Sequence, residues 1–262
     1  MKKFFTSVPF QASLSKVVYR PVGDAQLVYE KAHSLPILNV INNYTEKGEA
    51  IEVIFLVGEN DNIRRNLESV KSSLNELVNE KELQCRIEYV YYRDSDDITV
   101  MLELYGKLIR LCNDDDEIYS CITYGTKPVP MVQMMAMRYA FHVKKNVYIG
   151  MIVYGKAFGT IQNKDAADIY DMTSLFYIED AAVLAFEKGI GITEIPVPAG
   201  LPPVSGEYDS FGVIRLEPVS DQLKSVAGSY LYLLMGRVSE FLPRSVEHGV
   251  RVVFRSARAG TR

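Results

Sequence analysis

Short, mostly apolar segments alternate with longer segments of helical periodicity in the N-terminal part of the chain, and this alternation constrains the fold more than any other feature. Continuous apolar runs suit strands that are covered on both faces of a sheet. The helical segments between them supply the crossovers that parallel strands require. The pattern therefore predicts an α/β fold, a Rossmann-like, doubly wound and mostly parallel sheet, with strands at residues 2–8, 51–57, 85–92, 117–123 and 147–153.

Three of the intervening segments have the periodicity of amphipathic helices. In the first, apolar residues recur at steps of four and three over residues 63–77, and Asp61 is placed to cap the start. The second begins at Asp96 or Asp97, and its predicted apolar face consists of Ile98, Met101, Leu102, Tyr105, Leu108, Ile109 and Cys112. The third covers about residues 128–142, and we interpret its methionines as side chains that fill the core: Met131, Met134, Met135 and Met137.

Composition excludes several classes of protein. The chain of 262 residues is 48% apolar, has a net charge of −4 and therefore has no global positive field that would attract nucleic acid. Its three cysteines include no CxxC pair, which argues against a disulfide framework or structural zinc and for a reduced cytoplasm. The histidines are well separated, and no segment is long enough to span a membrane. We expect a cytoplasmic protein without a metal, a cofactor or a membrane partner.

The turn after the fourth predicted strand has the composition of a ligand-binding loop. Its sequence is Thr-Tyr-Gly-Thr-Lys at residues 123–127, followed by Pro128, a residue type favoured at the first position of a helix. Gly125 permits a close approach of backbone to ligand, while hydroxyls and a lysine flank it. Oriented backbone N–H groups at such a strand-to-helix turn, with the positive end of the helix dipole behind them, favour phosphate or another anion. An ordinary strand-to-helix connection has a similar composition, so both interpretations stay open.

Two other predicted strands also end in polar turns. In a doubly wound sheet, ligands bind at the carboxyl ends of the strands, near the point where the strand order reverses. We therefore expect all three turns to lie on one rim and to suit a phosphorylated ligand with hydrogen-bonding bases. The GxxxxGK[ST] and GxGxxG fingerprints are absent, which argues against NTP hydrolysis and NAD binding. The other two turns contain Thr6, Ser7 and Gln11, and Gly58, Glu59 and Asn60.

At these residues the chain resembles the CRISPR-associated Rossmann-fold (CARF) sensors. The family's usual turn is close to Thr-Gly-Gly-Thr-Lys, so Tyr124 stands where the family often has glycine. The resemblance extends to Phe-Phe-Thr-Ser-Val-Pro-Phe-Gln at residues 4–11, to Pro36, to Asn-x-Tyr-x-x-Lys-Gly at 42–48, to Val-Gly-Glu-Asn at 57–60 and to Val-Tyr-Gly at 153–155. It covers roughly residues 1–185.

The resemblance implies a sensor of cyclic oligoadenylate, the ring messenger of type III CRISPR antiviral defence. Similar proteins bind the ring across the two-fold axis of a homodimer, where each subunit presents the same patch to half of the ligand. The resemblance implies that residues 125–127 contact the ring phosphates. It also implies that the turn after the first strand, with Thr6, Ser7 and Gln11, lines the pocket, and that the turn with Gly58, Glu59 and Asn60 recognises ribose or adenine. The ring of Tyr124 either stacks on a base or narrows the site. The implied ligand-binding set is Thr6, Ser7, Gln11, Gly58, Glu59, Asn60, Thr123, Tyr124, Gly125, Thr126, Lys127 and Tyr154.

The C-terminal part does not indicate a known effector. We predict a sensing domain at residues 1–190, a Pro/Gly-rich linker at 191–206 and a small region of α or α+β character at 207–262. The Arg and His of the usual helical ribonuclease effector have four to six residues between them, whereas Arg244 and His248 have only three. No metal-dependent nuclease pattern is present.

Three hypotheses follow. The first is a sensor that passes ligand binding to an effector. The second is a ring nuclease that cuts its ligand in the same pocket, with Lys127 stabilising the developing charge and Ser7 or Thr6 assisting. The third is a transcription regulator, suggested by the arginine-rich tail. The sequence supports it least, because the tail has no basic helix face that would bind DNA or RNA. The size of the ring depends on pocket width, which composition does not encode.

Overall fold

The computed structural model describes residues 1–22, 27–157, 166–173, 175–177, 190–192 and 216–218. The chain forms two compact units, residues 1–173 and 174–262. In the second unit, the described strands β8 (Ile190–Ile192) and β9 (Leu216–Pro218) pair antiparallel. The helices and the Arg-rich tail predicted beyond residue 218 lie outside the described residues, and the predicted boundaries at residues 190 and 206 stay predictions.

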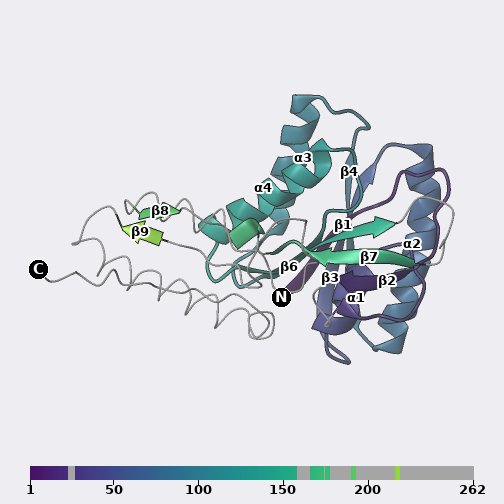
Figure 1. The fold of residues 1–262 in the computed structure, drawn as a ribbon. Helices are drawn as coiled ribbons and strands as arrows, with labels where there is room; N and C mark the ends of the chain where they lie inside the picture. Colours follow the sequence, from purple (N-terminus) through teal and green to yellow (C-terminus); the bar gives the residue numbers. More distant parts are fainter. Residues whose placement is uncertain (23–26, 158–165, 174, 178–189, 193–215, 219–262) are drawn as a thin grey trace, which may run out of the picture. The chain divides into compact units, whose positions relative to one another are not determined.

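The first unit contains the predicted α/β fold, built on a seven-stranded sheet in the order β2-β7-β6-β5-β1-β3-β4 (Figure 1). Five strands, β4, β3, β1, β5 and β6, run parallel, whereas β7 is antiparallel to β6 and parallel to β2. Apart from β2, which lies at the far edge beside β7, the chain moves outward from β1 through β3 and β4 and then continues on the other side of β1 through β5, β6 and β7, so the strand order reverses between β1 and β5. The strands are β1 (Lys2–Ser7), β2 (Val18–Val22), β3 (Ala50–Gly58), β4 (Gln84–Tyr92), β5 (Glu117–Cys121), β6 (Tyr148–Ala157) and β7 (Ala166–Asp171).

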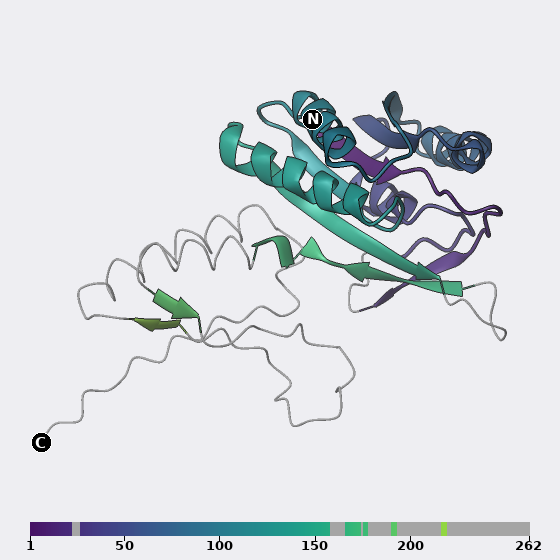
Figure 2. The ribbon, with the colours of Figure 1, turned by 90° about the horizontal axis from the view of Figure 1, so that it is seen from above.

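Four helices cover the sheet in two pairs, α1 with α2 on one face and α3 with α4 on the other (Figure 2). The predicted second and third helices start and end within a few residues of the observed ones. The cap of α2 differs from the prediction, because the side chain of Asn60, and not Asp61, accepts the N–H of Asn62. Asp97 caps α3 as one of the two predicted residues. The helices are α1 (Ile37–Tyr44), α2 (Asp61–Glu80), α3 (Ile98–Leu111) and α4 (Pro128–Val143).

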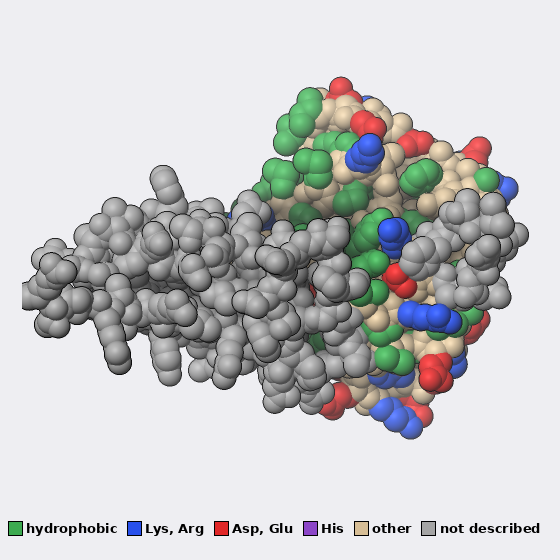
Figure 3. Space-filling model, viewed as in Figure 1, with side chains coloured by type: hydrophobic (Ala, Val, Ile, Leu, Met, Phe, Trp, Pro, Cys, Tyr) green, Lys and Arg blue, Asp and Glu red, His purple; other side chains and the backbone are tan. Residues whose placement is uncertain are grey.

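The outer faces of α3 and α4 correct two predictions. Ile98 and Leu102 were expected in the core but are 69% and 61% exposed, whereas Met101 and Leu108 are buried as predicted, together with Val100 and Leu104. Met131 and Met135 of α4 are likewise exposed, while Met137 is buried. Both helices are apolar on more than one face, so periodicity alone did not identify the side that packs on the sheet. Figure 3 shows apolar side chains gathered over these two helices.

Two strands of this sheet were not predicted. β2 is an edge strand that carries Arg20 and Pro21, and proline in a sheet is largely confined to edge strands because it cannot donate to a ladder. β7 alternates small, charged and aromatic residues instead of forming an apolar run.

No helix in the described ranges is long and apolar enough to cross a membrane. Cys112 and Cys121 are buried, as expected of small core residues, and Cys85 is half-buried.

A buried ion cluster lies at the amino-terminal edge of the sheet. The ammonium of Lys3 is 2.9 Å from a carboxylate oxygen of Asp116 and 3.4 Å from one of Glu52, and all three side chains are almost completely buried. The Lys3 ammonium also donates to the carbonyl of Leu111. Each buried charge therefore has partners, which offsets the cost of removing it from water. The cluster joins β1, β3 and the start of β5 at the edge opposite the predicted ligand rim.

Candidate functional site

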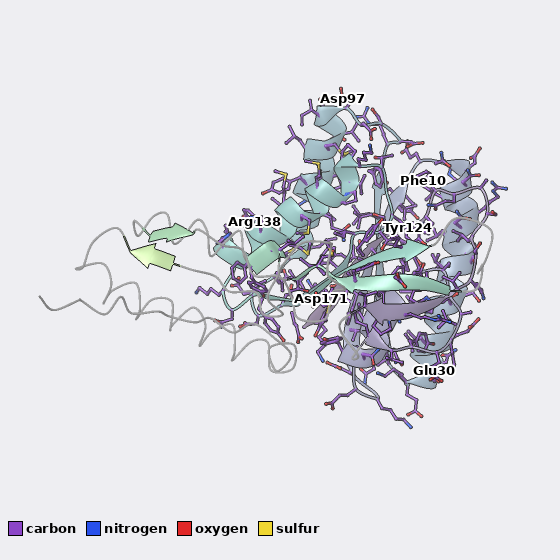
Figure 4. The ribbon with its side chains drawn as sticks, in the orientation of Figure 1. Phe10, Glu30, Asp97, Tyr124, Arg138 and Asp171 are labelled. Atoms are coloured by element: carbon purple, nitrogen blue, oxygen red, sulfur yellow. The ribbon has the colours of Figure 1, made fainter. Side chains whose placement is uncertain are left out.

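The turns after β1, β3 and β5 lie at one edge of the sheet, as predicted. In the parallel ladders, Thr6 of β1 is in register with Phe55 of β3 and with Cys121 of β5. The first turn is fixed to α2, because the side-chain amide of Asn66 donates to the carbonyls of Pro9 and Gln11, at 2.8 and 2.9 Å. Figure 4 shows the labelled Phe10 and Tyr124 at this edge. The rim thus surrounds the point where the strand order reverses.

The first two residues of the turn at 123–127 are bound to the protein interior. The hydroxyl oxygen of Thr123 accepts the N–H of Gly155 at 2.8 Å. The hydroxyl of Tyr124 donates to the carbonyl of Ser34 at 2.8 Å and lies 3.3 Å from the hydroxyl of Tyr19. Burial raises the pKa of Tyr124 to about 12. The ring therefore packs against the core and fixes the turn, which argues against its predicted alternative role as a stacking platform.

The last three residues of the turn are partly or fully exposed, and their backbone N–H groups lie just before α4. Pro128 and Pro130 have no N–H, and the N–H of Val129 donates to the carbonyl of Thr126, so the first turn of α4 offers no free N–H group. Any free N–H donors at this strand-to-helix turn must therefore precede α4. The backbone N–H groups of residues 124–127 donate to no acceptor in the described part of the chain. Gly125, with a φ of 103°, bends the turn where these groups lie.

The hydroxyl of Ser7 lies beneath this turn without a hydrogen-bond partner among the described residues. The side chain is completely buried, and a Cβ atom placed on Gly125 would lie 3.4 Å from its Oγ. A buried hydroxyl without a partner is uncommon, because desolvation of a polar group costs about 1–3 kcal/mol. Thr6 is equally buried, and its hydroxyl lies 3.5 Å from the Ser7 carbonyl. Neither hydroxyl is exposed, and their catalytic roles stay predictions.

The remaining predicted residues are distributed around the rim. Gly58 is buried, and a Cβ atom there would lie 2.9 Å from Ile63 Cδ1, so its role is close packing. Glu59 and Gln11 are exposed, and Asn60 caps α2. Tyr154 is partly exposed on β6, where its ring lies beside that of Tyr170. The structure therefore collects the predicted set at one edge, but ligand contact by each member stays a prediction.

Sequence reasoning missed the acidic loop at residues 93–97, which joins β4 to α3. The hydroxyl of Thr126 donates to Asp96 at 2.7 Å, and the side-chain amide of Asn60 donates to Asp94 at 3.0 Å. Asp96 was considered only as a possible helix start. The sequence signal for this loop was the group of three aspartates that follows β4, a strand that ends at the same rim. Lys127, in contrast, is exposed and forms no ion pair within the described ranges.

The rim can provide N–H donors, hydroxyls and one lysine to an anion, next to acidic side chains. No group of three or more His, Cys, Asp or Glu residues in the described part of the chain is arranged to hold a metal ion.

Comparison with known proteins gives one similarity. No family model matches the chain. Over 101 residues, or 37% of its length, the chain is 33% identical to a CRISPR-associated protein of Methanocaldococcus jannaschii. The matched segment spans 15% of that relative's length. The chain is thus similar, over part of its length, to a protein associated with CRISPR systems.

Proposed function

We propose that this protein is a cyclic oligoadenylate sensor of type III CRISPR signalling that binds the ring as a homodimer, with the turn at residues 123–127 as the phosphate contact. The similarity to a CRISPR-associated protein supports the cellular context. The CARF-like motifs support the class of ligand. Both are consistent with the Rossmann-like strand order, in which ligands bind at the point where the order reverses.

The observation that carries the proposal is the set of unused donors at this turn. The backbone N–H groups of residues 124–127, the buried hydroxyl of Ser7 and the ammonium of Lys127 have no acceptor in the described part of the chain. Successive N–H groups around a residue of positive φ form a concavity that suits an anion. Phosphate oxygens would satisfy these donors, and charge-assisted hydrogen bonds are stronger than neutral ones.

The apolar surface of α3 and α4 supports the homodimer. It consists of four side chains that are 56–69% exposed, Ile98, Leu102, Met131 and Met135. The surface begins one turn from Lys127, because Met131 lies four residues further along α4. Monomeric proteins rarely expose contiguous apolar patches of large size. A second copy would cover this surface and bring a second turn toward the same ligand, as a ring with two-fold symmetry requires.

Calorimetry with cyclic tetra-adenylate, cyclic hexa-adenylate and linear oligoadenylate tests the ligand. We expect one ring to bind, and Lys127→Ala to weaken binding at least tenfold, because a hydrogen bond to a charged group contributes about 1.5–3 kcal/mol. Lys145→Ala, which removes an exposed lysine outside the rim, is the matched control. If neither ring binds the unaltered protein, the proposed function is wrong. Chromatography of the recovered ligand distinguishes a sensor, which returns the ring intact, from the ring nuclease alternative.

Sedimentation equilibrium tests the homodimer. We expect Met135→Glu to shift the protein toward monomer, because it places a charge in the centre of the surface that the partner would bury. Val28→Glu, at an exposed apolar position outside this surface, should leave the dimer intact. A monomeric unaltered protein, or a dimer that both variants preserve, would remove this part of the proposal.

A further inference from the structure

The acidic loop at residues 93–97 crosses the rim and binds two of the other turns. Asp94 accepts a hydrogen bond from Asn60, which follows β3, and Asp96 accepts one from Thr126, which follows β5. The loop itself follows β4, and in the sheet β3 and β1 lie between β4 and β5. The loop therefore extends past the carboxyl ends of both strands, next to the point where the strand order reverses.

We propose that Asp96 is an autoinhibitory residue that holds Thr126 until an anionic ligand displaces it. The inference rests on the proposed function, because it assumes that phosphate binds the turn. The hydroxyl of Thr126 has one hydrogen, which it donates to Asp96 at 2.7 Å. A phosphate oxygen that binds this hydroxyl must take the place of the carboxylate. If the carboxylate stayed beside the phosphate, two negative charges would repel each other within one turn.

Among the described residues, no cation pairs with the carboxylate of Asp96. Arg93, the cation of the same loop, pairs with Glu103 of α3 at 3.5 Å. Asp97 accepts the N–H of Thr99 as the cap of α3. No described lysine or arginine forms an ion pair with Asp94 or Asp96. A phosphate that approaches Lys127 therefore meets net negative charge on the other side of the rim.

Displacement of Asp96 has a structural consequence at α3. Asp97, the next residue, caps this helix, and Ile98 is its first residue. Release of the Thr126 contact therefore frees the segment that fixes the start of α3. Ile98 and Leu102, in the first turns of α3, belong to the apolar surface described above. The contact thus couples occupation of the turn to the surface proposed to meet the second copy.

The first test compares the affinity of the unaltered protein, Asp96→Asn and Asp96→Ala for cyclic tetra-adenylate and cyclic hexa-adenylate. Both variants should bind a ring about fivefold or more tightly, in the range typical of coupling between states. The gain should shrink as salt is added, because the removed repulsion is electrostatic. Asp114→Asn is the control of equal charge change, since Asp114 accepts the N–H of Lys145 away from the rim. It should change affinity less than twofold.

The second test needs no ring. Hydrogen exchange of the backbone amides at residues 94–97 should be faster in Thr126→Val than in the unaltered protein, because valine cannot donate to Asp96. Thr126→Ser retains the hydroxyl and should exchange like the unaltered protein. Equal exchange in all three proteins would overturn the inference.

The outcomes separate the two proposals. Equal or weaker ring binding by both Asp96 variants overturns the autoinhibitory role and leaves the sensor intact. Binding by the variants but not by the unaltered protein supports the autoinhibitory role in its strongest form. If no protein binds either ring, the sensor and the inhibition of its site both fail, even where the exchange experiment detects the Thr126 contact.

Discussion

The substitution Gly125→Ala tests the geometry of the candidate anion site, because two separate costs add at this position. Gly125 has a φ of 103°, which an alanine adopts at a cost of about 1–2 kcal/mol. An added Cβ would also lie 3.0 Å from both Cβ and Cγ1 of Val129, which is closer than ordinary contact. Overpacking of this kind costs about 1–3 kcal/mol. We expect the free energy of unfolding to fall by about 2–5 kcal/mol.

Gly48→Ala is the matched control. Gly48 has a φ of 80°, but a Cβ atom there would have no atom within 4 Å. It should therefore show the backbone cost alone, about 1–2 kcal/mol. The loss of unfolded-state entropy on replacing glycine by alanine is similar in both variants and largely cancels in the comparison.

Urea denaturation of the three proteins measures these values, with the slope of the transition checked for constancy. The difference between the two variants isolates the contact with Val129, for which we expect about 1–3 kcal/mol. If Gly125→Ala is no more destabilising than Gly48→Ala, the turn does not approach α4 as closely as described. The geometry assigned to the donors of residues 124–127 would then be refuted.

Three further substitutions have expected outcomes. Tyr124→Phe should lower the free energy of unfolding by about 1–3 kcal/mol in urea denaturation, because it leaves the buried carbonyl of Ser34 without its donor. His33 is buried, and burial lowers its pKa from 6.5 to about 4. Below pH 6.5 the unfolded chain therefore binds a proton that the folded chain does not, and stability falls as pH decreases toward 4, by about 3 kcal/mol in total. His33→Phe should lack this pH-dependent loss of stability. If the difference in free energy of unfolding between the two proteins is constant from pH 7 to 4, the assignment to His33 is wrong. Lys3→Met should cost up to about 3–5 kcal/mol because it removes the buried cation between two buried carboxylates, which keep only their contacts with Arg86 and the amino terminus, whereas Lys2→Met, at a partly exposed pair, should cost about 1 kcal/mol or less by the same denaturation assay.

The sequence was sufficient to predict the central part of the fold. Strands β1, β3, β4, β5 and β6 are continuous apolar or mixed apolar runs, and their alternation with helices implies parallel pairing. The common rim then follows from topology, because parallel strands end at the same edge. The edge strand β2 and its neighbour β7 have no such run, because charged residues and a proline interrupt their apolar positions.

The details of the site depended on contacts that no local pattern encodes. Tyr124 binds the carbonyl of Ser34, which lies 90 residues earlier in the chain, so its role as an anchor could not be read from the turn. Thr126 binds Asp96 from a different loop, 30 residues away. The prolines at 128 and 130 were visible in the sequence. Their consequence, the absence of free N–H groups in the first turn of α4, could have been predicted from the chemistry of proline alone.

The turn combines fixed and free groups within five residues, and this division explains how it could bind an anion with little reorganisation. Thr123 and Tyr124 are hydrogen-bonded to β6 and to the segment before α1, and these contacts fix the backbone where the turn begins. Pro128 restricts the backbone where it ends. Between these points, the N–H groups up to Lys127 are held in place without being used by the described residues. Donors that are already positioned lose little entropy when a ligand binds, so under the proposed function the anchors would contribute to affinity without touching the ligand.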